Sequence, residues 1–124
     1  MNINKYNYMN TRSSIAYMID IIENISSMNK QIHDLMENYQ IKDNIFVFKN
    51  NVLEEVVGGY FQVIEESNDI NELVKKYFTE SIKQQKGIRI IDNNTYQLGV
   101  VYKHLSECSE NQQIFDIECN KNVR

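Results

Sequence analysis

Residues 87–96 read Gly-Ile-Arg-Ile-Ile-Asp-Asn-Asn-Thr-Tyr (GIRIIDNNTY), and the interpretation of this stretch decides the fold. Its apolar run ends at Asp92 and two asparagines, residue types that compete for backbone hydrogen bonds and tolerate left-handed geometry. We therefore interpret residues 79–92 as a helix that the DNNT segment ends. The frayed end allows Arg89, Asn94 and Tyr96 to turn into one cleft.

The composition indicates one ordinary globular domain. The chain has 124 residues, of which 42% are hydrophobic and 24% charged, close to the averages for globular proteins. We expect residues 1–124 to form a single domain, with residues 1–10 and 120–124 as flexible ends. No apolar run approaches the ~20 residues of a membrane span, and the polar N-terminus lacks the apolar segment of a secretion signal. These features predict a cytoplasmic protein with no membrane contact.

The pattern of apolar residues predicts an all-α fold. The chain has no proline and four glycines, and no segment shows sustained alternation with hairpin turns between. We expect an up-and-down bundle of four to five helices. The expected segments are a helix from near Asn10-Thr11 to Tyr39, one over roughly 44–66, a short one capped within SNDINEL and ending near Tyr77, one over 79–92, and one from near Tyr96.

Two of these helices carry features that need a neighbour. In the first, the apolar residues Ile15, Met18, Ile19 and Ile22 follow a spacing of three and four, which places them on one face. In the second, Gly58-Gly59 falls mid-helix, where each glycine costs ~1 kcal/mol relative to alanine. Either another backbone approaches there, at a helix crossing or across a dimer, or the pair is a tolerated defect.

Metal and cofactor chemistry has little support in the sequence. Two cysteines and two distant histidines are fewer ligands than a metal site needs. There is no glycine-rich phosphate loop. We therefore predict no metal and no cofactor.

The charge distribution leaves two readings open. The net charge is -4, which disfavours polyanion binding by the whole surface. Residues 75–89 are nonetheless basic, because the only acidic residue among them is Glu80. The basic residues of this segment are Lys75, Lys76, Lys83, Lys86 and Arg89. Such a segment either docks RNA or forms a solvated helix face.

The order of these segments resembles the HEPN-domain family, specifically the toxin half of nucleotidyltransferase–HEPN toxin-antitoxin pairs. The resemblance is carried by NVLEEVVGGYFQVIEE, NELVKKY and ESIKQQKGIRIIDNNTY. Gly87, Ile88, Arg89 and Tyr96 match the family motif, and Val56-Val57-Gly58 partly matches a second stretch. The resemblance implies a homodimeric, metal-independent endoribonuclease, a hydrolase whose two motif helices build one RNA-cleaving cleft. It further implies that Arg89 holds the scissile phosphate, and that Tyr96 is modified with AMP by a nucleotidyltransferase antitoxin.

The residue chemistry agrees with part of this implication and departs from the rest. A guanidinium pairs with phosphate through two hydrogen bonds, so Arg89 with Lys83 and Lys86 forms a candidate RNA-binding site. Asn94 stands where the family has histidine, and an amide cannot transfer protons near neutrality. Losing a general acid or base removes a factor of ~10²–10⁴ in rate. With Arg89, Asn94 and Tyr96 as the candidate catalytic residues, we expect RNA cleavage to be weak or lost.

Two alternatives stay open. One is a non-catalytic helical dimer that acts as a protein-interaction module with a nucleotidyltransferase partner. The other is an unrelated small bundle whose likeness to the family is due to chance.

Overall fold

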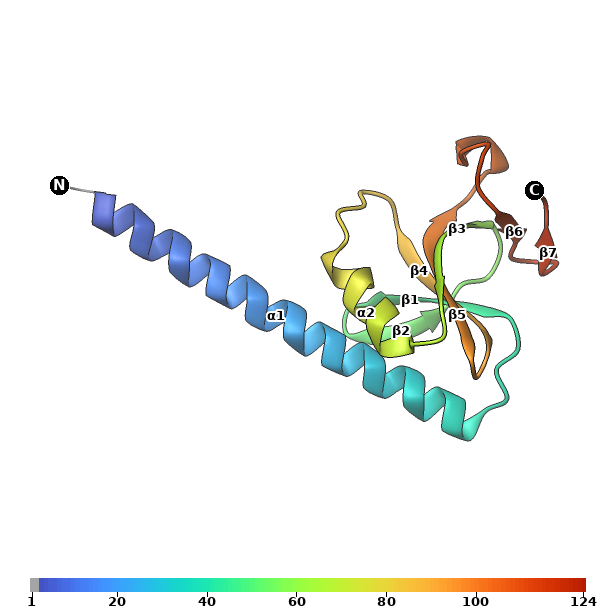
Figure 1. Ribbon diagram of the computed structural model, residues 1–124, viewed down its shortest axis with the longest axis horizontal. Helices are drawn as coiled ribbons and strands as arrows, with labels where there is room; N and C mark the ends of the chain where they lie inside the picture. Colours follow the sequence, from blue (N-terminus) through green and yellow to red (C-terminus); the bar gives the residue numbers. More distant parts are fainter. Residues whose placement is uncertain (1–2) are drawn as a thin grey trace.

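A long N-terminal helix and a seven-stranded antiparallel sheet make up most of the fold (Figure 1). The computed structural model describes residues 3–124, with side chains from residue 14 onward. The strands lie in the order β2-β1-β4-β5-β3-β6-β7. The elements are α1 (Ile3–Asn38), β1 (Asn44–Lys49), β2 (Val52–Glu55), β3 (Tyr60–Ser67), α2 (Ile70–Thr79), β4 (Lys86–Asp92), β5 (Thr95–Tyr102), the 3-10 turn η1 (Leu105–Glu107), β6 (Ile114–Asp116) and β7 (Lys121–Asn122).

The predicted all-α bundle of four to five helices is wrong, because most of the expected helices are strands. The segment 44–66 holds β1, β2 and most of β3, and the segment 79–92 holds the end of α2 and β4. The last expected helix, from near Tyr96, begins instead as β5. The described residues contain two α-helices and a mixed α/β arrangement.

Asparagine and glycine pairs make the turns that break these segments. Asn50 and Asn51 have φ of 53° and 64°, and they join β1 to β2 as a two-residue loop, the geometry of the tight hairpin turns that twist with the strands. Gly58 and Gly59 also have positive φ, 82° and 93°, between β2 and β3. The predicted mid-helix glycine pair is therefore a turn between strands.

The two observed helices were expected from the sequence. The prediction of a helix at the N-terminus is confirmed, although α1 begins at Ile3 rather than near Asn10. The predicted short helix capped within SNDINEL is confirmed as α2, and Asp69 caps it by accepting hydrogen bonds from the amides of Asn71 and Glu72. Of the predicted flexible end at residues 1–10, residues 1–2 lie outside the described residues, and α1 begins at Ile3. The predicted flexible end at residues 120–124 includes β7, which pairs with β6.

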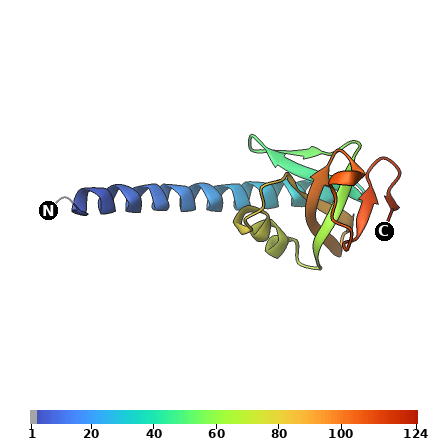
Figure 2. The same ribbon diagram turned by 90° about the horizontal axis from the view of Figure 1, so that it is seen from above.

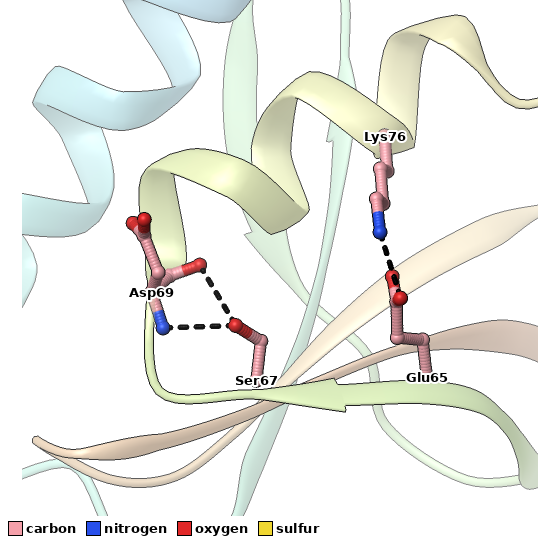
Figure 3. A network of polar contacts seen from close by, with 4 residues as sticks. All are labelled: Glu65, Ser67, Asp69 and Lys76. Carbon is pink, nitrogen blue, oxygen red and sulfur yellow. Dashed lines mark hydrogen bonds and ion pairs between the residues drawn. The ribbon is translucent and has the colours of Figure 1, made fainter.

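Short polar contacts fasten α2 to the end of β3 (Figure 3). The Ser67 hydroxyl accepts a hydrogen bond from the Asp69 amide at 3.0 Å. Near the C-terminal end of α2, Lys76 Nζ lies 2.7 Å from Glu65 Oε1 of β3. These contacts fix the direction in which α2 leaves the sheet.

The sheet buries apolar side chains on both faces. On one face, α1 and α2 cover the main core, which includes Met28, Ile32, Leu73, Ile88 and Ile90. On the other face, Ile45 of β1 and Phe115 of β6 pack on Phe61 of β3. Because β1 and β6 are separated by three strands in the sheet, their shared cluster shows that the sheet curls around this second core.

The C-terminal half of α1 is joined to the sheet edge at β2. Gln31 Oε1 accepts a hydrogen bond from the Leu53 amide at 2.9 Å, and its amide nitrogen donates to the Asn51 carbonyl at 2.8 Å. A side chain thus satisfies backbone groups of an edge strand that a foreign chain could otherwise pair with.

The N-terminal half of α1 extends well beyond the rest of the molecule (Figures 1 and 2). We call α2 and the strands, residues 44–122, the head. Residues 14–20 are all exposed, whereas Met28 and Ile32 are fully buried against the head. Among the residues that the structure describes, no helix has both the length and the apolar character that crossing a membrane requires.

Candidate interaction surface

The stretch GIRIIDNNTY forms a hairpin of β4, a turn and β5, and this hairpin separates the residues of the predicted nuclease site. Side chains alternate between the two faces of a strand. In the register of the hairpin, Arg89 pairs with Gln97 and Ile90 pairs with Tyr96. Arg89 therefore lies on the face of the second core, and Tyr96 lies on the opposite face, under the helices.

Arg89 is 5% exposed, and its guanidinium is engaged inside the head. Nη1 donates a hydrogen bond to Gln97 Oε1 at 2.8 Å, and Nη2 forms an ion pair with Asp43. The guanidinium carbon lies 3.4 Å from the ring centroid of Phe115, a cation–π contact. Burial lowers the pKa of Arg89, and the neighbouring Asp43 opposes that shift. The charge of this residue is used to close the second core.

The hydrogen-bond network continues from Arg89 to the surface. Gln97 Nε2 donates to Glu66 Oε1 at 2.8 Å, and Gln97 is itself 2% exposed. Asp43 is held in position by a backbone hydrogen bond from its amide to the Ile91 carbonyl, 3.1 Å long. The network thus links β4 and β5 to β3 and to the segment that follows α1.

Tyr96 belongs to the main core. It is 4% exposed, and its hydroxyl donates a hydrogen bond to the Asn93 carbonyl and lies 3.8 Å from Met36 Sδ. Burial raises the pKa of its phenol. The ring packs between the hairpin and α1.

The remaining predicted site residues lie at two ends of the hairpin. Asn94 is exposed in the turn, where its amide donates to Asp92 Oδ1 at 2.8 Å. Lys86 begins β4 at the other end of the strand from Asp92, six residues or roughly 20 Å away at strand rise. Its Nζ donates to the Glu80 carbonyl at 3.0 Å, and burial lowers its pKa. Lys83 is exposed between α2 and β4. The structure does not bring Arg89, Asn94, Tyr96 and the two lysines together.

Two open pockets where the head meets the preceding segments are candidates for a small ligand. A cavity of about 470 Å³ borders the Arg89–Asp43 pair and is lined also by Gln40, Lys42 and Asp92. A smaller one, about 280 Å³, lies between α1 and the β1–β2 hairpin. Within residues 14–124, no group of three or more His, Cys, Asp or Glu side chains is placed to hold a metal. Both cysteines are free thiols.

The most unusual surface of the described chain is on α1. Ile15, Met18, Ile19 and Ile22 are 52%, 59%, 48% and 61% exposed, and at 100° per residue they span about a quarter of the helix circumference. We call these four residues the stripe. Tyr17, 65% exposed, lies on the other side of the helix. The sequence had identified the stripe as apolar, and no side chain of residues 14–124 covers it in the structure.

Comparisons with family models, curated proteins and solved structures found no match for this chain.

Proposed function

We propose that this protein is a non-catalytic protein-interaction module that associates with a second copy of itself through the stripe of α1. The observation that carries the proposal is the half-exposure of four large apolar side chains on a helix that extends beyond the head. Monomeric proteins rarely leave contiguous apolar surface uncovered, and such patches mark interaction sites. Covering the exposed part of each side chain contributes about 1–2 kcal/mol.

The spacing of apolar residues along α1 fits a helical partner. We call one row of them the seam; its members, spaced by three, four and three residues, are Ile15, Met18, Ile22 and Ile25. This is the heptad spacing at which two helices interlock their side chains, and Ile25, the last of the row, also packs partly against the main core. Isoleucine and methionine fill the seam without polar interruption over these positions. An amphipathic helix of the same chain, present at equal concentration, offers the matching surface.

The charge of α1 favours a protein partner over a lipid surface. Residues 14–29 contain no lysine or arginine, and they carry Asp20 and Glu23. Helices that lie on anionic membranes are rich in basic residues on their polar face. We therefore assign the stripe to a protein interface, and we place the protein in the cytoplasm on the sequence grounds given above.

An endoribonuclease activity stays a prediction of the family resemblance, and no contact in the head favours it. We expect purified protein to leave total RNA intact, because the donors of Arg89 are already engaged with Gln97 and Asp43. Fragments ending in a cyclic phosphate, absent with Arg89→Ala, would contradict the non-catalytic assignment. The nucleotidyltransferase partner implied by the same resemblance would then gain support.

The proposal is tested by light scattering on the wild-type protein and on Ile15→Glu. We expect the wild type to have twice the chain mass and the variant to have the chain mass, because the substitution places like charges in an apolar seam. Flotation with anionic vesicles provides the second arm. A monomeric wild type, or one that floats with vesicles, would contradict the proposal.

A further inference from the structure

The seam on α1 is open only along its N-terminal part. The heptad positions continue beyond Ile25 as Asn29, Ile32 and Met36. Ile32 is fully buried and Met36 is packed in the main core. At the same level, His33 Nε2 lies 3.3 Å from Asn71 Oδ1 at the start of α2. From about residue 29 onward, the head occupies the place that a partner helix would take.

We infer that the two copies pair with their α1 helices antiparallel, with Ile15 of one helix opposite Met18 of its partner. This inference rests on the proposed self-association and adds its orientation. The part of α1 that precedes the fully buried Met28 begins at Ile3 and is about 37 Å long at helical rise. Its midpoint falls beside Ile15, so an antiparallel pair crossing there overlaps along the whole of both segments.

A parallel pair would use the seam less well. Both heads would lie at the same level, and each would fill the seam from Ile32 onward. The two heads would meet on the seam side of the helices, so the helices would have to diverge near Ile25, which already packs against the main core. In the antiparallel pair, the partner's helix begins at Ile3 near the level where the head closes the seam.

The geometry places the two heads at opposite ends of a rod. Each head closes the end of the seam where the partner's helix begins. The arrangement presents two identical heads pointing away from each other, as a bivalent module.

Orientation is measured by distances between spin labels in two variants, Glu23→Cys and Lys30→Cys. Both positions are exposed on α1. Both variants also carry Cys119→Ser, because Cys119 is exposed and would react with the label, whereas Cys108, the other cysteine, is 8% exposed. The difference between the distances at the two positions does not depend on the length of the label arms, because the arms are the same at both. Diluting labelled chains with unlabelled ones removes the signal between copies and serves as the control.

The antiparallel pair predicts axial separations of about 20 Å at residue 23 and about 40 Å at residue 30. A parallel pair predicts a short distance at residue 23, where the axes lie about 10 Å apart, and no axial separation at either position. That result would overturn the orientation and leave the self-association standing. Absence of any signal between copies, with a monomeric mass, would overturn the self-association itself.

Discussion

Replacing Met18 with glutamine tests the stripe with little change to the single chain. Met18 is 59% exposed on α1, methionine and glutamine are similar in length, and both favour helix. The head does not contact this position, so we expect the unfolding of the head to be unaffected. The change instead removes apolar surface from the seam between two copies.

The expected magnitude follows from the exposed fraction. Full burial of a methionine side chain contributes about 1.5–3 kcal/mol, of which the exposed 59% corresponds to about 1–2 kcal/mol. A symmetric pair loses this contribution twice, about 2–4 kcal/mol in total. At 1.4 kcal/mol per factor of ten, the dissociation constant should rise by about 30- to 700-fold.

Sedimentation velocity over a concentration series measures this constant. The matched control is Tyr17→Gln, which removes an equally exposed large side chain from the other side of the same helix. We expect Tyr17→Gln to leave the dissociation constant within a few-fold of wild type. Equal effects of the two substitutions, or none from Met18→Gln, would refute the assignment of the stripe as the interface.

Three further predictions concern the head. Arg89→Ala should lower the free energy of unfolding by about 3–5 kcal/mol, since it breaks a buried ion pair, and wild-type stability in urea would show instead that the guanidinium is free for a ligand. Gly59→Ala should lower the stability of the head more than Gly58→Ala. Both residues have positive φ, but only at Gly59 would a new Cβ overlap the backbone, at the Tyr102 carbonyl oxygen. Equal unfolding midpoints of the two variants would contradict this prediction. Burial raises the pKa of Tyr77 in the folded chain. The contribution of this shift to stability is therefore complete below the unfolded pKa of about 10 and is lost as the pH rises through the folded pKa. The free energy of unfolding should decline less across alkaline pH in Tyr77→Phe than in the wild type, and an identical decline would exclude Tyr77 as the cause.

The helices were predictable because their signals are local. The capping chemistry of Asp69 and the three-four spacing along α1 both lie within a few residues of the structure they specify. The strands were not predicted, because the alternation of apolar and polar residues that identifies a half-buried strand was absent. Residues 45–47 and 96–100 are buried without interruption, since the sheet is covered on both faces, and such runs show no alternation. Short uninterrupted apolar runs cannot be told from helix by period.

The turn signals were present and were misread. Asn50-Asn51 and Gly58-Gly59 each separate runs rich in valine, isoleucine and phenylalanine, and both pairs take positive φ in the structure. Because the chain has only four glycines, asparagine supplies much of the left-handed backbone that its turns require. Read as hairpin turns, these pairs would have split the segment 44–66 into strands.

The surroundings of Arg89 could not be inferred from neighbouring residues. Its ion-pair partner Asp43 is 46 residues earlier in the chain, and Phe115 is 26 residues later. The sheet register brings these groups together. The stripe, by contrast, was visible in the sequence as an apolar face. The sequence could not show that no other part of the chain described by the structure covers this face.

The most direct measurement of the central claim is a filtered nuclear Overhauser experiment on a mixture of isotope-labelled and unlabelled protein. Only contacts between two copies give signals in such a sample. We predict signals between the methyl groups of Ile15, Met18 and Ile22 and the partner's α1. Signals confined to residues of the head, or none at a concentration where the protein is fully associated, would contradict the assignment of the stripe as the surface at which two copies meet.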